Sequence, residues 1–435
     1  MQRNRESSDD EGEYKVYSRR YFLLCLYSCF TFLIGFQQLE YTSITNVVTK
    51  YYNVDSVAVN WTNILQNLCT ALFSFFIGKL TEKYGFRKSM ITFTFLGIIG
   101  AVIKCFAIDR SLFWLLMVGQ FFPCIFFTPT FSLSSLLGAL WFKPKEIALV
   151  IGMGNAAITF GMAVTFLLPS LVFKSDSINE IKYNLAYVSV ILMLLEATIF
   201  LLTLIFVTEK PPTPPSLAEE TRTNIEIPKI INLMRNKNFL LPIMCFAFGC
   251  ASVQLISITL NQSILSRFSN GNTVLSVSGV LLMITAIPGS LLIGTVSKAY
   301  PRYKLLLIIV CFISVTFQVL FLLSLWIKCD WLLYVSIFLF GVFVNASQVL
   351  ALDFVLEVSF PFPENLSFAI SFTAFSLPNL ILVPLATILC KKVGAVNANF
   401  VFLALGIMTL VSALLAKEDL RRRKANAEMT PLLAS

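Results

Sequence analysis

Twelve apolar runs divide the chain, and they restrict its fold more than any other feature of the sequence. As helices, runs of about 20 residues span the roughly 30 Å hydrocarbon core of a bilayer. The predicted spans are 21–48, 57–80, 89–107, 111–140, 147–173, 183–207, 239–265, 274–297, 304–327, 331–356, 366–390 and 396–416. The sequence therefore predicts an all-α membrane protein with twelve transmembrane helices.

The composition agrees with this prediction and excludes an ordinary soluble domain. Hydrophobic residues make up 57% of the 435 residues, and charged residues make up only 13%. A soluble domain carries about 25% charged residues. The first apolar run follows a charged head and is longer than the apolar core of a signal peptide, so we interpret it as the first membrane helix.

Basic residues are distributed unevenly between the loops. If both termini are cytoplasmic, 24 of the 33 lysines and arginines fall on the cytoplasmic side. They lie in segments 1–20, 79–88, 143–145, 210–237, 298–304 and 417–435. The positive-inside rule then predicts an even number of helices and cytoplasmic termini. The net charge of +9 follows from this topology and from contact with anionic lipid, so it requires no nucleic-acid partner.

One short loop occurs twice, at half-chain spacing. The first copy, Gly-Lys-Leu-Thr-Glu-Lys-Tyr-Gly-Phe-Arg-Lys at 78–88, joins the second and third apolar runs. A degraded copy occupies 294–304, where Lys298 replaces the glutamate and Pro301 the second glycine. A repeat of this kind predicts two pseudo-symmetric six-helix bundles.

The first copy also predicts a gating latch. Gly78 and Gly85 permit sharp turning and close approach of the backbone. The carboxylate of Glu82 can bond an arginine or a helix N-terminus. We therefore expect Glu82 and Arg87 to hold the cytoplasmic side closed through a bond that breaks when the bundles move.

The domain organisation follows from the runs and their borders. We predict a disordered head at 1–20, bundles at 21–207 and 239–416, a cytoplasmic linker at 208–238 and a tail at 417–435. The linker is rich in proline, as linkers often are. In the tail, Glu428 precedes Leu432-Leu433 by four residues, a pattern that resembles an endolysosomal sorting signal. The predicted location is the plasma membrane, with the endolysosomal membrane as the alternative.

Polar residues interrupt the first and seventh runs at similar depth. Gln37 and Gln38 lie about as far into the first run as Gln254 lies into the seventh, where Asn261 and Gln262 follow. Polar groups at matching positions of two repeats predict a substrate site near the membrane midplane. Residues 38, 41, 42 and 45 would share one face of the first helix.

Buried acids leave two interpretations open. Glu40 either faces the cavity or has a purely structural role, in which it pairs with Lys104 or lies at the outer end of the span. Together with Glu196, Asp353 and Glu357 it permits coupling to protons or cations without requiring it. The chain has ten cysteines and no histidine, so we predict reduced buried thiols, no metal site and no cofactor.

These features resemble the major facilitator superfamily. Gly78, Leu80, Gly85, Arg87 and Lys88 fit the signature between the second and third helices of that superfamily, with Glu82 in place of the usual aspartate. More specifically, the chain resembles the feline leukaemia virus subgroup C receptor family, described as choline, ethanolamine and haem transporters. This resemblance is carried by 16–20, Phe36-Gln37, Tyr41, Lys104-Cys105, 119–121, 141–146, 166–169 and 260–262.

Departures from that family concern the substrate. The resemblance implies that choline-carrying relatives hold the quaternary ammonium between a helix 1 tryptophan and a helix 7 tyrosine, where this chain has Gln38 and Gln254. Family glutamines in helices 5 and 11 correspond to Thr159 and Ser376. Losing two ring faces forfeits about 0.5–2 kcal/mol of cation–π attraction each. A pocket lined by amides instead favours a ligand that donates and accepts hydrogen bonds.

The predicted function is transport of a small polar organic solute by alternating access, by a chain that acts as a monomer. The predicted lining residues are Gln38, Tyr41, Thr159, Gln254, Asn261 and Ser376, with Gln37 and Gln262 in support. One alternative is a haem or porphyrin carrier, although no histidine is available as an axial ligand. Another is a receptor or sensor that binds without carrying. The sequence contains no nucleophile–base constellation that would indicate an enzyme.

Overall fold

A computed structural model describes residues 18–142, 146–174, 177–209, 237–300, 302–359 and 364–417. Most of the predicted head and of the 208–238 linker lies outside these residues, and so does the tail with Leu432 and Leu433. Side chains of a few residues within the helices, including Glu82, also lie outside the description.

The described part of the chain is built from helices, and twelve segments are long and apolar enough to cross a membrane. The first half contains α1 (Arg19–Leu39), α2 (Thr45–Tyr52), α3 (Ser56–Phe106), α4 (Phe113–Trp141), α5 (Ile147–Thr165), α6 (Leu168–Leu171) and α7 (Ile178–Phe206). The second half contains α9 (Lys237–Leu265), α10 (Gly271–Ile284), α11 (Ala286–Ala299), α12 (Tyr303–Ile327), α13 (Asp330–Ser359), α14 (Glu364–Lys392), α15 (Ala395–Ala398) and α16 (Phe400–Leu415). The predicted class and number of spans are confirmed.

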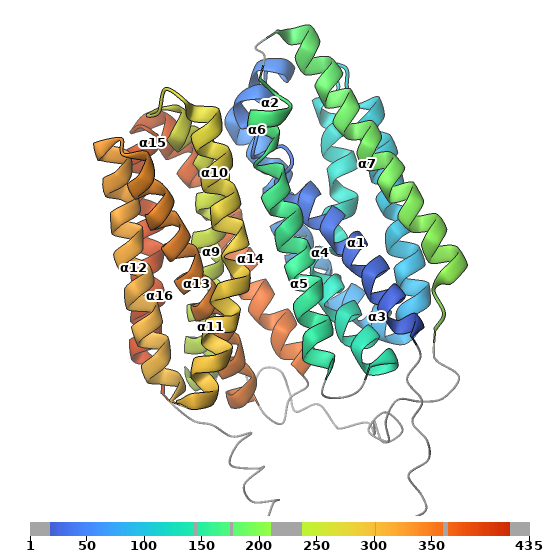
Figure 1. Cartoon of the computed structure of the whole chain (residues 1–435), viewed down its shortest axis with the longest axis vertical. Helices are drawn as coiled ribbons and strands as arrows, with labels where there is room; N and C mark the ends of the chain where they lie inside the picture. The colour runs from blue at the N-terminus through green and yellow to red at the C-terminus, as the bar shows by residue number, and fades with distance from the viewer. Residues whose placement is uncertain are drawn as a thin grey trace, which may run out of the picture.

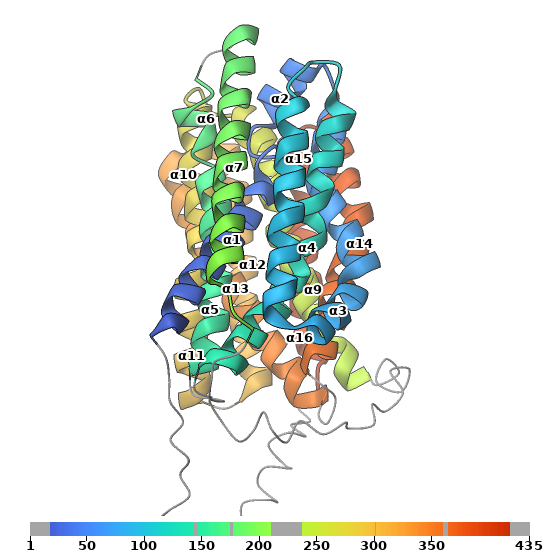
Figure 2. The same cartoon turned by 90° about the vertical axis from the view of Figure 1, so that its right-hand side faces the viewer.

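The two halves lie side by side, coloured blue to green and yellow to red in Figure 1, and Figure 2 faces the first half. We call the end where α1 begins and α16 ends the basal end. The opposite end, which carries α2, α6 and α15, is the distal end (Figure 1). Successive spans run in alternating directions between these two ends.

Helix α3 contains two spans, Ser56–Thr81 and Lys83–Phe106, that fold back on each other at Gly85. Gly85 has φ 80° and ψ −178°, a conformation that glycine adopts without the steric cost of a Cβ. Both ends of α3 return to α2, where the Tyr52 hydroxyl donates to the Ala107 carbonyl at 2.9 Å. The loop predicted over 78–88 is therefore narrower, with the reversal centred on one glycine.

The predicted first span of 21–48 is wrong in its second part, because α1 ends at Leu39 and α2 begins only at Thr45. The Thr42 and Ser43 hydroxyls donate to carbonyls three residues earlier, at 3.2 and 3.1 Å. Asn261 donates to the Ser43 carbonyl at 2.9 Å from the other half. The contact from Asn261 uses the Ser43 carbonyl, an acceptor that a continuing helix would need, and hydroxyl bonds of this kind favour turns. The helical face expected to unite residues 38, 41, 42 and 45 is therefore not formed.

Packing repeats between the two halves. In the first half α1 packs on α5, and α3 packs on α4 and α7; in the second half α9 packs on α14, and α12 packs on α13 and α16. Gly161 lets α1 and α5 approach closely, because a Cβ there would overlap the Phe32 carbonyl. The halves meet where α3 packs on α14 and where α5 packs on α10. These two contacts exchange under the same pseudo-symmetry, so the region between them is the natural place for a site.

Candidate functional site

A cavity of about 900 Å³ lies between the two halves. Its walls come from α3, α4 and α5 on one side and from α9, α11, α13 and α14 on the other. It extends toward the basal end, because Lys79, Leu149 and Asp353 line it and each lies near the basal end of its span. The cavity is large enough for a small organic solute.

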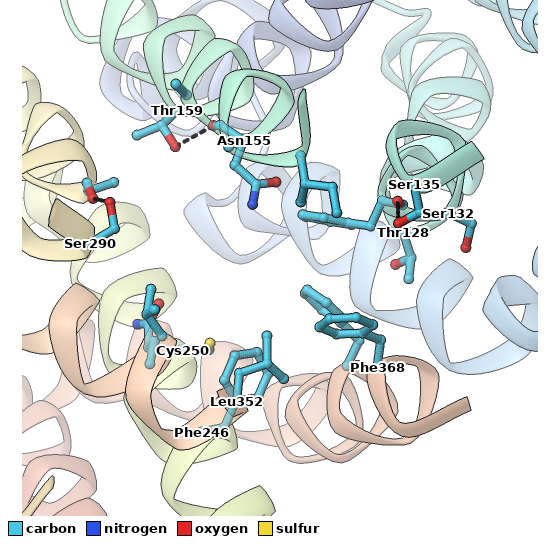
Figure 3. A pocket seen from close by; sticks show the side chains of 18 of the residues that line it. Thr128, Ser132, Ser135, Asn155, Thr159, Phe246, Cys250, Ser290, Leu352 and Phe368 are labelled. Atoms are coloured by element: carbon cyan, nitrogen blue, oxygen red, sulfur yellow. Dashed lines mark hydrogen bonds between the residues drawn. The ribbon is translucent and has the colours of Figure 1, made fainter. Parts of the chain in front are cut away.

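Neutral polar groups are spread over the cavity wall among apolar side chains. They are Ser74, Thr128, Ser132, Ser135, Asn155, Thr159, Ser290, Asn345 and Gln348, several of which appear in Figure 3. Among the described lining residues, only Lys79 and Asp353 carry charge, and both lie toward the basal opening. The interior of the cavity can therefore exchange hydrogen bonds with a ligand but offers little charge to pair with.

Three phenyl rings from both halves form an aromatic surface in the same cavity. Phe131 of α4 stacks on Phe372 of α14, with ring centroids 4.9 Å apart and planes at 29°. Phe246 of α9 meets Phe372 edge-to-face at 5.6 Å and 83°. These rings can contact the carbon skeleton of a solute.

Distal to the cavity, a layer of amides joins the two halves. The Gln254 Nε2 group of α9 donates to Asn63 Oδ1 of α3 at 2.5 Å. The Asn379 amide of α14 donates to Gln254 Oε1 at 2.9 Å, and the Asn63 amide donates to the Gln38 carbonyl at 3.0 Å. Four elements that belong to different halves are thus fastened by one chain of hydrogen bonds. We call Gln38, Asn63, Gln254 and Asn379 the amide layer.

Further hydrogen bonds and an ion pair join the two halves between the amide layer and the distal end. The Asn261 amide donates to Asn46 Oδ1 at 2.9 Å, and the Asn60 amide donates to Thr387 Oγ1 at 2.8 Å. An ion pair joins Lys391 at the end of α14 to Asp55 at the start of α3. The molecule is therefore closed distally and hollow basally.

The predicted lining residues separate into two groups. Thr159 lines the cavity, and its hydroxyl donates to the Asn155 carbonyl at 2.9 Å (Figure 3). Gln254 and Asn261 belong to the distal closure, and the Gln38 side-chain oxygen is buried without a partner among the described residues. The two glutamines predicted at the cage positions therefore share one layer, bridged by Asn63.

The other predicted polar residues lie away from the cavity wall in this conformation. Tyr41 is buried, with the Lys104 ammonium 5.4 Å from its ring centroid. The Ser376 hydroxyl donates to the Phe372 carbonyl at 2.8 Å. The Gln262 amide nitrogen is buried with no partner among the described residues.

Of the two interpretations of Glu40, the pairing with Lys104 is the one that forms. The Lys104 ammonium donates to Glu40 Oε2 and to Gln37 Oε1, both at 3.0 Å. The Gln37 amide nitrogen in turn donates to Glu196 Oε1 at 2.8 Å. Gln37 therefore joins two acids and a base in the interior of the first half.

The predicted latch remains a prediction, because the Glu82 side chain lies outside the described side chains. At the Gly85 turn, the described acid in contact is Glu209, which follows α7. Glu209 Oε2 accepts the Arg87 backbone N–H at 3.0 Å, and a Cβ on Gly85 would overlap its other oxygen. Our sequence analysis missed this carboxylate, whose only signal was its position at the border of the linker.

The sequence analysis also missed most of the cavity wall. Ser132, Ser135 and Asn155 were not singled out, although serines and threonines recur through the second half of α4. That recurrence was the available signal, since hydroxyls in a membrane span concentrate on faces turned away from lipid.

Comparisons with known proteins agree with the fold. A family model described as Major Facilitator Superfamily matches residues 21–366. The Danio rerio choline/ethanolamine transporter flvcr2a is 27% identical over 424 residues, which cover 95% of this chain and 90% of the relative. The Mus musculus choline/ethanolamine transporter FLVCR1 is 25% identical over 440 residues, which cover 95% of this chain and 77% of the relative.

Two solved structures share the architecture. The crystal structure of a D-xylose-proton symporter superposes with a TM-score of 0.69 at 14% identity, covering 92% of this chain and 98% of that one. The crystal structure of a bacterial homolog of the human lysosomal transporter Spinster, inward-facing and occupied, superposes with a TM-score of 0.66 at 13% identity. The superposition covers 92% of this chain and 96% of that one. At these identities the similarity concerns the fold alone.

Proposed function

Because the chain belongs to the Major Facilitator Superfamily, it is a membrane transporter of small solutes and not an enzyme, and we propose that its substrate is a small organic solute that donates hydrogen bonds. The cavity carries this proposal. Hydroxyl and amide groups from both halves, such as Thr128, Asn155 and Asn345, face a space of about 900 Å³ between the two halves. A site built from such groups discriminates against ligands that leave its buried polar atoms unpaired.

The names of the relatives give two probes that differ in this property. Ethanolamine has an ammonium with N–H donors as well as a hydroxyl, whereas the quaternary ammonium of choline has no N–H. The cage positions hold Gln38 and Gln254, so neither offers a ring face to a quaternary ammonium. The cavity wall instead supplies the amides of Asn155, Asn345 and Gln348. The phenyl rings of Phe131, Phe246 and Phe372 can contact a short carbon chain. We therefore propose that solutes of the ethanolamine type are preferred over choline.

Transport proceeds in this proposal by alternating access. The amide layer and the Asp55–Lys391 pair separate to open the distal end, while the basal ends of the halves approach and close the cavity. The basal end carries most of the basic residues, so we place it and both termini in the cytoplasm. One chain supplies both walls of the cavity, so a monomer suffices, and we place it in the plasma membrane.

Labelled ethanolamine and choline in proteoliposomes test the proposal. We expect ethanolamine uptake to have the higher kcat/KM, and we expect exchange of internal for external label in counterflow. A receptor that only binds would give no counterflow. A higher kcat/KM for choline would contradict the proposed preference.

A matched pair of threonine variants locates the site. Thr159→Val should lower ethanolamine kcat/KM roughly 2- to 10-fold, which corresponds to one hydrogen bond of about 0.5–1.5 kcal/mol. Thr316→Val is the control, because Thr316 makes the same bond to the carbonyl four residues earlier but is exposed on the outer face of α12. Equal effects of the two variants would place the substrate elsewhere.

A further inference from the structure

Two acids and one base are buried together inside the first half. Glu40, Lys104 and Glu196 are each at most 2% exposed. They come from the turn after α1, from the second span of α3 and from α7. Gln37 connects them, since it accepts from Lys104 and donates to Glu196. We call Gln37, Glu40, Lys104 and Glu196 the buried acid–base cluster.

The charges in this cluster do not balance if both acids are ionised. Lys104 makes its ion pair with Glu40, at 3.0 Å. Among the described side chains, Glu196 has only the Gln37 amide as a hydrogen-bond partner. An ionised carboxylate is costly to bury without a counter-ion, so such a group takes up a proton instead.

One oxygen of Glu196 is placed to carry that proton. Glu196 Oε2 is buried and has no hydrogen-bond partner among the described residues. Gly97 provides the space it occupies, because a Cβ at that position would lie 2.9 Å from it. The carboxyl group therefore accepts a hydrogen bond at Oε1, whereas Oε2 is buried without one among the described residues.

The elements around Glu196 contribute few other titratable groups. Cys105 of α3 packs near Met193 of α7, with their sulfurs 3.9 Å apart. Tyr41 and Tyr52 lie beside Glu40, at the far side of the cluster. Of the described side chains facing the cluster, only Lys104 carries a positive charge.

The buried acid–base cluster is one residue away from the amide layer. Gln37 holds Lys104 and Glu196 through its side chain, while its own carbonyl accepts from Gln120 at 2.6 Å. The next carbonyl, that of Gln38, accepts from Asn63 of the amide layer. A change in the bonds of Gln37 therefore acts on the end of α1 where the two halves are fastened.

We propose that Glu196 binds a proton and that loss of this proton is coupled to opening of the amide layer, so that transport is linked to a proton gradient. This inference rests on the proposed function as a transporter. Protonation at Oε2 leaves the Gln37 bond to Oε1 in place and removes the unbalanced negative charge. Loss of the proton leaves Glu196 and Glu40 competing for Lys104, which draws Gln37 and the end of α1 away from their present positions. No covalent bond other than the O–H bond of the carboxyl forms or breaks.

Infrared spectroscopy tests the proton site without any substrate. We expect purified protein in liposomes to show the C=O stretching band of a protonated buried carboxyl, and the band to disappear as pH is raised. Glu196→Gln should abolish this band. Glu180→Gln, at an exposed acid on the same helix, should leave it unchanged. A band that persists in Glu196→Gln, or its absence from the native chain, would overturn the proposal.

Transport measurements then separate this inference from the proposed function. With labelled ethanolamine, Glu196→Gln should retain counterflow at equal pH on both sides but lose accumulation driven by a proton gradient. Glu196→Asp keeps the carboxyl and should retain some gradient-driven accumulation, which guards against a variant that merely misfolds. No counterflow in the native chain would count against the proposed function. Native counterflow with no response to the gradient would count against the coupling alone.

Discussion

Lys104 is the one buried base of the acid–base cluster, and it pairs with a buried acid inside the first half. Lys104→Met leaves the Glu40 carboxylate buried without its counter-ion. We expect the free energy of unfolding to fall by about 3–5 kcal/mol, since removing one partner of a buried pair exposes the other to the full desolvation cost. Thermal unfolding in detergent, followed by tryptophan fluorescence, measures the change.

The double variant Lys104→Met/Glu40→Gln distinguishes charge from packing. If the loss comes from the unpaired charge, neutralising Glu40 should restore part of the stability. Lys174→Met serves as the control, because that lysine is exposed. A double variant as unstable as Lys104→Met would show that the methylenes of Lys104, rather than its charge, stabilise the fold.

The two glycines of the predicted latch differ in what they tolerate. Gly85 has a φ of 80°, and a Cβ there would overlap Glu209, whereas a Cβ on Gly78 would have the Ser132 hydroxyl as its nearest contact, at 4.0 Å. We expect Gly85→Ala to destabilise the protein by roughly 1–2 kcal/mol and to slow transport, because L residues avoid this φ. Gly78→Ala should leave both nearly unchanged. Unfolding midpoints and uptake of the two variants at equal expression make the comparison, and equal behaviour would contradict it.

Residues that act together illustrate what the sequence reveals at this scale. The sequence analysis suggested Glu40 and Lys104 as partners, because an acid buried in an apolar run needs a base. It did not connect Gln37 with Glu196, which lie 159 positions apart. Nothing in the local pattern of α7 indicates which helix its acid faces, since that depends on how α1, α3 and α7 pack.

At the scale of helices, α3, α9 and α14 are held together by the amide layer. Gln254→Leu removes the bonds to Asn63 and Asn379. Each lost bond is worth about 0.5–1.5 kcal/mol, so the population open at the distal end should rise several-fold. Electron spin resonance distances between labels at Asn53 and Val393, in a chain without its own cysteines, would report that opening.

Thr259→Val is the matched control for this experiment. Thr259 lies on the same helix as Gln254, but its hydroxyl donates only to the Leu255 carbonyl of α9. It should leave the distance distribution unchanged. A distribution in Gln254→Leu identical to that of Thr259→Val would mean that the amide layer does not hold the distal end closed.

Element boundaries show where sequence reasoning succeeded and where it failed. The lengths of the apolar runs and the distribution of basic residues between loops can be read from the linear sequence alone, and they predicted the twelve spans. The end of α1 at Leu39 depends partly on Asn261, which comes from α9. The break between α10 and α11 at Thr285 likewise lies within one apolar run. Apolar length cannot reveal such breaks, because they are set by side-chain bonds to the backbone and by contacts between halves.

At the scale of the whole molecule, pseudo-symmetry relates the two halves, but the side chains decide at which end the cavity opens. The contacts α3–α14 and α5–α10 are equivalent in the two halves, yet the distal side carries amides and an ion pair while the basal side carries a cavity. The repeated loop predicted the halves but could not predict the cavity wall, which combines residues as distant as Ser74 and Phe372. A rocking motion of the halves exchanges the closed end for the open one.

Thiol labelling tests this geometry from the two sides of the membrane. In a chain without its own cysteines, Asn155→Cys lies in the cavity and should react with a membrane-impermeant maleimide added from the basal side. Ser257→Cys should resist labelling from either side, because Ser257 is buried within α9. Ethanolamine should slow the labelling of Asn155→Cys by occupying the cavity. Reaction from the distal side alone would contradict this geometry. It would mean that the distally open conformation predominates in the membrane and that the conformation closed by the amide layer is the less populated one.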